Sequence, residues 1–367
     1  LPTAADWAHF SLSRDGRDMG CVVNGSVYWW SEDEGYRVLA EGDPEMAGVG
    51  MSADGQALAA ARRGVSGSTP TVWFDDGRVL DLAITIPDCP RDVTPLWSCD
   101  VGTAGSVVVG QTNDCRKDMG FVWSANGDLR ILGKNDECTS HVNAVSADGR
   151  IVVGFCEHPG EGFRRPVLWR EGPGHQLFLG ESRQGEARNV SPDGRIVVGQ
   201  ADLGGLTPQA FSWTDGDKPV GLGTLRGRAT DPSLATAVSN DGRVVGWSGD
   251  SLWGEQEAFV WTAQRGMMGL AQLLQDHGVD IPEGLVLSTA IDISGDGKTV
   301  VGVGRDKDWN PRFWRANLGD TTPAAPITAR KPDPHQPDST RPDSLDAFHS
   351  DFLHPFPFGK RRYAPFQ

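Results

Sequence analysis

The chain has 367 residues, of which 38% are hydrophobic, and it carries a formal net charge of −15. This acidic balance argues against nucleic acid as a partner, because binding to phosphates requires a basic surface. No apolar run approaches the roughly 18 residues of a membrane-spanning helix, so no transmembrane segment is predicted. Length alone suggests two domains, but one large repeat fold would absorb most of the chain.

A hairpin built on a tight glycine turn recurs seven times along the chain. Asp193-Gly194 is the clearest case, because an alternating half-strand precedes it and the β-branched run Ile196–Val198 follows. Successive turns lie 39, 50, 44, 45, 48 and 55 residues apart, close to the period of a propeller blade. The turn glycines are Gly16, Gly55, Gly105, Gly149, Gly194, Gly242 and Gly297.

A tryptophan follows each turn glycine by 13 to 20 residues and provides a second anchor in the same register. It marks a third strand, and a short fourth strand such as 220–223 follows. The sequence therefore predicts an all-β fold, a seven-bladed β-propeller of four-stranded antiparallel blades over residues 1–320. The tryptophans are Trp29, Trp73, Trp123, Trp169, Trp213, Trp261 and Trp314.

In chain order, the pattern is regular in the first blade, divergent in the second, and lacks the turn aspartate in the third. A short helix over Leu270–Asp276 is expected between the sixth and seventh blades. The seventh blade has no clear fourth strand after Trp314. Residues 1–8 or the segment near Ala325–Ala329 could supply it, and the sequence does not decide between them.

Three elements of the repeat resemble the HAF repeats of bacterial extracellular proteins and autotransporter passengers. They are the Ala-Val-Ser-x-Asp-Gly-x-x-Val-Val-Gly hairpin, the Ala-Phe-x-Trp strand and Gly-Leu-Gly, and 258–304 follows the pattern nearly in full. The Ser-Pro-Asp-Gly of the fifth repeat is also similar to TolB-type propeller repeats. The resemblance covers about residues 8–316 and implies a secreted or surface propeller. It transfers no catalytic residues, because the shared motifs are turn and packing positions.

The six cysteines are even in number and lack metal-ligand spacing, which suits an oxidising compartment. Two bridges are predicted across hairpins, Cys99–Cys115 and Cys138–Cys156. The alternative is that several are buried thiols, Cys21 especially. The chain begins at Leu1, and we interpret it as a mature extracellular sequence whose signal peptide has been removed.

The composition changes after residue 320, where residues 321–367 hold nine of the 24 prolines. Residues 321–344 read as a semi-rigid spacer. Residues 345–367, the C-terminal arm, are too aromatic for a plain linker. We expect the arm to bind a neighbouring copy of the protein, or alternatively to fold back on its own propeller. Its aromatic and basic residues are Phe348, Phe352, Phe356, Phe358, Lys360, Arg361, Arg362, Tyr363 and Phe366.

Other candidate sites lie on the loops between second and third strands, which should emerge on one face. Trp247, Trp253 and Trp309 fall outside the repeated position and could stack on sugars, or could cap the blade cores. His158 with Arg164 and Arg165, or His141 instead, could serve a polysaccharide lyase or hydrolase. Glycosylation candidates are the sequons at Asn24 and Asn189 and the spacer residues Thr321, Thr322, Ser339 and Thr340.

No metal or cofactor is predicted. Asp306–Asn310 begins like a calcium loop, but Pro311 stands where glycine is needed and no glutamate closes the loop. The repeated turn aspartates are read as hairpin residues. No nucleophile elbow or phosphate loop is present. The sequence therefore predicts a secreted, non-enzymatic assembly subunit that binds copies of itself, with glycan binding as the alternative.

Overall fold

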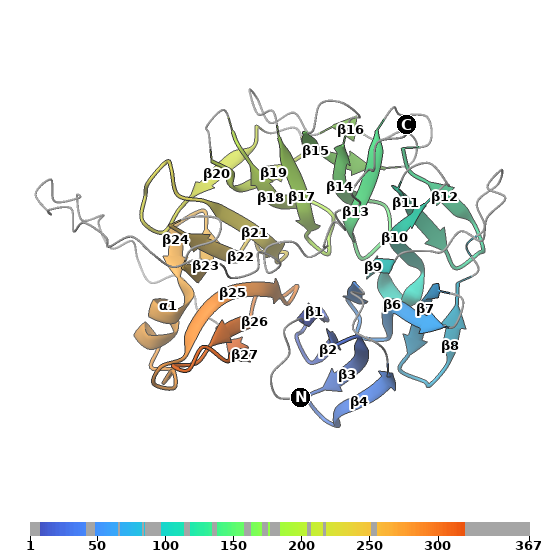
Figure 1. The fold of residues 1–367 in the computed structure, drawn as a ribbon, viewed down its shortest axis with the longest axis horizontal. Helices are drawn as coiled ribbons and strands as arrows, with labels where there is room; N and C mark the ends of the chain where they lie inside the picture. Colours follow the sequence, from blue (N-terminus) through green and yellow to red (C-terminus); the bar gives the residue numbers. More distant parts are fainter. Residues whose placement is uncertain are drawn as a thin grey trace, which may run out of the picture.

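The computed structural model describes residues 8–41, 48–64, 67–82, 84, 97–113, 118–133, 138–157, 163–170, 175–176, 184–203, 207–215, 218–250 and 255–319. These residues form seven antiparallel sheets arranged in a ring, with the first strand of each sheet nearest the central axis (Figure 1). The predicted seven-bladed β-propeller is confirmed.

The first four blades have four strands each, and pairing runs outward in chain order. Blade 1 contains β1 (Ala8–Leu12), β2 (Asp18–Val23), β3 (Ser26–Ser31) and β4 (Gly35–Ala40). Blade 2 contains β5 (Val49–Met51), β6 (Ala57–Gly64), β7 (Gly67–Phe74) and β8 (Val79–Asp81). Blade 3 contains β9 (Trp97–Val101), β10 (Val107–Asn113), β11 (Asp118–Ser124) and β12 (Leu129–Ile131), with the 3-10 turn η1 (Thr103–Gly105). Blade 4 contains β13 (Thr139–Val145), β14 (Val152–Glu157), β15 (Arg164–Trp169) and β16 (His175–Gln176).

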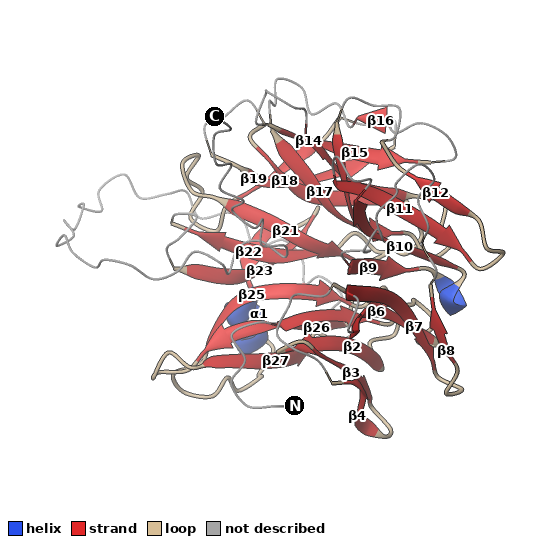
Figure 2. Ribbon diagram, turned by 45° about the vertical axis from the view of Figure 1, so that its right-hand side comes forward, coloured by secondary structure: helices blue, strands red, loops and turns tan. Residues whose placement is uncertain are grey.

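The last three blades follow the same plan (Figure 2). Blade 5 contains β17 (Gly185–Val190), β18 (Ile196–Ala201), β19 (Gln209–Thr214) and β20 (Val220–Gly223). Blade 6 contains β21 (Ser233–Val238), β22 (Val244–Gly249), β23 (Gln256–Thr262) and β24 (Gly266–Gly269), and α1 (Leu270–Asp276) follows as predicted. Blade 7 has three strands within the described residues, β25 (Val286–Ile293), β26 (Thr299–Arg305) and β27 (Pro311–Asn317). Both segments considered for its fourth strand lie outside the described residues, except Ala8, which belongs to blade 1.

All seven turn glycines have a positive φ, between 70° and 83°. Glycine is favoured there because it has no Cβ to clash in the left-handed region. In six turns the preceding serine hydroxyl donates to the aspartate at distances of 2.5 to 2.8 Å. The turn aspartates therefore stabilise the hairpins, as predicted.

The hairpin turns also join neighbouring blades, and the end of the propeller that they form is called here the turn face. At each of the seven junctions, a backbone amide in the turn of one blade donates to an oxygen in the turn of its neighbour. The ring closes because Asp296 N of blade 7 donates to Arg14 O of blade 1. The pairs, donor first, are Arg14–Ala53, Ala104–Asp54, Thr103–Ala147, Ala147–Pro192, Asp193–Asn240, Asn240–Gly295 and Asp296–Arg14.

Hydrophobic cores lie between blades. Phe211 is fully buried between blades 4 and 5, where it packs with Leu168 and Val197. The seam between blades 7 and 1 has a core of the same kind, in which the rings of Phe10 and Phe313 meet edge to face at 5.2 Å. Packing as well as turn hydrogen bonds therefore closes the ring.

The glycine that ends each Val-Val-Gly run has a separate structural role. In blades 3 to 7 it lies next to an extra residue that bulges out of the first strand. In blade 5, a Cβ on Gly199 would overlap the carbonyl oxygen of Glu186. Blades 1 and 2 have Cys21 and Ala60 at this position, and their first two strands pair without a shift. The bulge therefore occurs where the second strand provides a glycine.

Replacing Ser191 by alanine tests the turn motif. The buried hydroxyl of Ser191 donates to Asp193 at 2.7 Å and accepts from the Ile196 amide at 3.0 Å. Its loss should lower the free energy of unfolding by about 1–2 kcal/mol, because a buried amide loses its partner. The measurement is the urea unfolding midpoint. Ser212→Ala, on the half-buried face of β19, is the control and should change little.

Candidate functional site: the loop face

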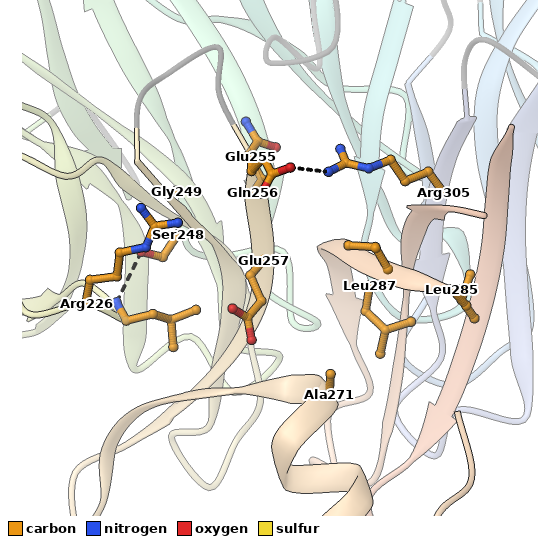
Figure 3. A pocket seen from close by; sticks show the side chains of 12 residues that line it. Arg226, Ser248, Gly249, Glu255, Gln256, Glu257, Ala271, Leu285, Leu287 and Arg305 are labelled. Atoms are coloured by element: carbon orange, nitrogen blue, oxygen red, sulfur yellow. Dashed lines mark hydrogen bonds and ion pairs between the residues drawn. The ribbon is translucent and has the colours of Figure 1, made fainter. Parts of the chain in front are cut away.

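The end of the propeller opposite the turn face is called here the loop face. Second strands end there and third strands begin there, so the predicted common face for these loops follows from the strand order. Between blades 6 and 7 the loop face is hollowed by a cavity of about 320 Å³, shown in Figure 3. This volume lies at the lower end of the size range of small-ligand pockets, about 300–1,000 Å³.

The hollow has a mixed lining. Apolar side chains come from α1, from the start of β25 and from the segment that follows β20. Charged ones come from that same segment, from the start of β23 and from the end of β26. Figure 3 shows Glu257 and Leu287 on opposite sides of it. The lining residues are Leu225, Arg226, Ser248, Gly249, Glu255, Gln256, Glu257, Ala271, Leu285, Val286, Leu287 and Arg305.

Both arginines of the hollow are engaged with acids. Arg305 Nη2 lies 3.6 Å from Glu255 Oε1, and Arg226 Nη1 lies 3.8 Å from Asp250 Oδ2. Glu257 is exposed at the start of β23. Counting Asp250, the hollow has three carboxylates against two guanidinium groups, so its charge is −1.

Trp309 stands beside the hollow. Its side chain is 70% exposed, and the guanidinium of Arg305 lies 4.1 Å from the ring centroid. The loop that holds it is closed by Asp306, whose carboxylate accepts from the amides of Asp308 and Asn310 and pairs with Arg312 at 2.6 Å. Hydrogen bonds from Asn310 and Asp308 and the charge of Arg312 hold the pKa of Asp306 below its usual range, against the effect of desolvation. Asp306 thus serves as the internal anchor of its loop.

The interpretation of Trp247 as a sugar-stacking residue is wrong. Trp247 lies inside β22 and is 2% exposed, because it pairs with the buried Ala258 and Leu234 on the two neighbouring strands. The alternative, that it caps a blade core, fits its position. Trp253 and His158 lie outside the described residues.

A second group of charged residues is buried at the loop-face end of blades 4 and 5. Glu186 lies between two arginines and forms ion pairs with Arg164 and with Arg188, the latter at 2.7 Å. Glu186 and Arg188 are 3% and 8% exposed, whereas the side chain of Arg164 is 23% exposed. Arg165, beside Arg164, is half-buried. A buried pair of this kind adds little net stability, because the cost of desolvating the charges offsets their attraction.

His141 belongs to the same group. Its ring stacks on Phe155 with centroids 4.5 Å apart, and the amide of Gln111 lies 2.9 Å from Nδ1. Burial, and then the positive charge of Arg164, lower the pKa of His141 to about 4. The imidazole is therefore neutral at physiological pH and packed as a core residue. Sequence reasoning singled out Arg164 and His141 but missed Glu186, Arg188 and Gln111.

Within the described ranges, no three His, Cys, Asp or Glu side chains are grouped so that they could hold a metal ion. No described helix is long and apolar enough to cross a membrane. The predicted Cys138–Cys156 disulfide is present. Cys21 is a buried thiol whose pKa burial raises to about 12. For Cys99–Cys115 the side chains lie outside the described residues.

The two sequons differ in accessibility. Asn24 is exposed in the β2–β3 turn with φ 49°, whereas Asn189 is half-buried in β17. The spacer candidates and the whole C-terminal arm lie outside the described residues.

No family model and no curated protein matches the sequence. Solved structures do match. The β-propeller domain of the Trilobed protease from Pyrococcus furiosus, which has an open velcro topology, is 10% identical, with a TM-score of 0.57 over 88% of this chain and 100% of that one. The fold is that of a β-propeller.

Two further solved structures extend the comparison. Prolyl oligopeptidase B from Galerina marginata is 10% identical, with a TM-score of 0.55 over 87% of this chain and 50% of that chain. Hydrazine synthase from Kuenenia stuttgartiensis is 14% identical, with a TM-score of 0.51 over 87% of this chain and 97% of that chain. TolB structures also match, at TM-scores of 0.42 and 0.41. Likeness at such identities shows the fold alone, so membership of the HAF-repeat family stays a prediction.

Proposed function

We propose that the protein is a non-enzymatic assembly subunit whose C-terminal arm, residues 345–367, docks on a neighbouring copy. The observation that carries this proposal is where the chain leaves the propeller. β27 runs from the loop face to the turn face, and the Leu318 amide then donates to Lys298 O in the last hairpin turn, at 2.7 Å. An aromatic, basic arm therefore follows a proline-rich spacer from one face of an acidic body.

Such a contact joins two different surfaces of identical subunits. Contacts of this kind give rings when the rotation closes and filaments when it does not. Opposite charges on arm and body would favour encounter, and the effect would weaken with salt. The Cys138–Cys156 bridge supports an oxidising, extracellular setting, because disulfides persist there.

The test compares the full chain with a truncation after Arg330, by light scattering and negative-stain electron microscopy. We expect the full chain to form rings or filaments and the truncation to be a folded monomer with an unchanged melting temperature. Two monomers of equal stability would refute the assembly role. A truncation that unfolds would instead assign the arm to its own propeller.

Glycan binding is the second candidate, and the exposure of Trp309 beside the hollow favours it. Aromatic faces stack on sugars, and the hollow offers donors and acceptors nearby. A glycan array gives the measurement. Saturable binding that Trp309→Ala abolishes would support this role, and an array without binding would remove it. Catalysis would require turnover of a polysaccharide that His158→Ala abolishes.

A further inference from the structure

The hollow between blades 6 and 7 has the features of a receptor for an aromatic, basic peptide. Leu225, Leu285 and Leu287 supply apolar surface, while the exposed Glu257 and the 70% exposed Glu255 supply negative charge at its edge. Grooves that bind peptides commonly combine an apolar floor for anchor side chains with charges that fix their orientation.

The same chain contains a segment of matching chemistry. In residues 356–363, two phenylalanines and a tyrosine flank the cluster Lys360-Arg361-Arg362. Aromatic side chains and arginine are the residue types that most often dominate the energy of protein interfaces. The hollow has room for only a small number of such side chains, so a short segment rather than the whole arm would fill it.

The described chain leaves the propeller on one face, and the hollow opens on the other. The exit from blade 7, after Leu318, is at the turn face, whereas the hollow is on the loop face. The 25 residues from 320 to 344 could span at most about 85 Å, which is enough to reach an adjacent molecule. When the turn face of one copy contacts the loop face of the next, each further copy can add in the same orientation.

We propose that residues 356–363 of one copy bind in the loop-face hollow between blades 6 and 7 of the next copy, so that subunits stack head to tail. This inference rests on the proposed assembly function and adds the receptor site to it. The acids at the hollow pair with the basic cluster, and an aromatic side chain from the arm packs against Leu285 and Leu287.

The experiment uses full-length chains that carry exposed charge reversals. The hollow variant combines Glu255→Lys with Glu257→Lys, and the arm variant combines Arg361→Glu with Arg362→Glu. The control combines Glu34→Lys with Asp75→Lys, which changes the net charge as the hollow variant does, but at exposed positions of the turn face. Self-association is measured by sedimentation velocity over a range of concentrations, with thermal unfolding as the check on folding.

We expect the hollow and arm variants each to weaken self-association at least about tenfold, since like charges facing each other across an interface oppose binding. The control should assemble as the wild type does. Mixed in equal amounts, the hollow and arm variants should assemble with each other although each alone does not, because the native arm of one fits the native hollow of the other and the reversed arm is complementary in charge to the reversed hollow. Placing all four reversals in one chain should restore assembly.

Three results would overturn the inference, and they differ in whether the assembly function still stands. If the arm variant dissociates while the hollow variant assembles normally, the arm docks elsewhere and the assembly function stands. If the wild type is a monomer at every concentration, the assembly function itself fails. A hollow variant that is monomeric and does not assemble when mixed with the arm variant would also count against this site.

Discussion

Replacing Gly199 by alanine should strongly destabilise the propeller, although it adds only one methyl group. The added Cβ would overlap the carbonyl oxygen of Glu186, a backbone atom that cannot rotate away. Blade 5 would have to remove the bulge at Arg188 or separate β17 from β18. We expect the free energy of unfolding to fall by on the order of 3 kcal/mol, the upper range for overpacked sites.

The control lies at the equivalent position of blade 2, where the chain already has Ala60 and the strands pair regularly. Ala60→Gly should cost less, about 1–2 kcal/mol, through the added freedom of the unfolded chain and the loss of one buried methyl group. Denaturant unfolding of both variants gives the comparison. Equal effects of the two substitutions would mean that the glycine does not determine the bulge.

Asp292→Asn should alter how stability depends on pH. Asp292 is half-buried on β25, where its carboxyl accepts the amides of Leu12, across the seam to blade 1, at 2.7 Å and of Ile293 at 2.8 Å. Burial raises its pKa to about 7, and the charge of Asp100 adds to the effect, although the hydrogen bonds oppose it. Asp100 has a pKa of about 7 for the same main reason and accepts the Val145 amide of blade 4 at 2.9 Å.

A raised carboxyl pKa means that the folded protein holds a proton that the unfolded chain has lost. The stability that the protonated Asp292 carboxyl contributes is therefore fully present below pH 3.8, and it is lost as the pH rises toward 7. For one such carboxyl the loss is at most about 4 kcal/mol. His9 and His141, whose pKa values burial lowers to about 4, act in the opposite sense, because their contribution is lost as the pH falls below 6.5.

The two effects oppose each other in the wild type, so the variant has to be compared with the wild type at each pH. The measurement is urea unfolding at half-unit steps from pH 4.5 to 8.5. The free energy of unfolding of the wild type minus that of Asp292→Asn should fall as the pH rises to about 7 and then level off. Glu34→Gln, at an exposed position, serves as the control with a constant difference. A constant difference for Asp292→Asn too would contradict the assignment.

The fold was predictable from the sequence because its signals are local. A turn glycine needs a positive φ whatever surrounds it, and all seven anchors have one. The helix at Leu270–Asp276 follows from a single short apolar pattern and is present at those residues. The repeated tryptophans all lie on third strands, as the spacing predicted.

The candidate sites were harder to predict because they depend on contacts between blades. Glu186 and Arg188 alternate with apolar residues, which normally indicates a half-exposed strand, but β17 is the first strand of its blade and is covered on both sides. Their partner Arg164 comes from the preceding blade. Trp247 was misassigned for a related reason, because β22 continues three residues beyond Val-Val-Gly and keeps the ring in the core. The signal that could have revealed this group was the presence of two charged residues, Glu186 and Arg188, inside a predicted first strand.

The ring of turn hydrogen bonds bears on where the chain can begin and end. The seam between blades 7 and 1 has the same kind of turn bond and the same kind of core as the other junctions. The described contacts at this seam are thus of the same kind as those at the other junctions, and they do not require the chain to begin and end there. A circular permutant opened in the exposed segment 227–230, with the original ends linked, would retain every described inter-blade contact except those of the opened loop. By the described contacts between blades, another blade could therefore come first in the sequence.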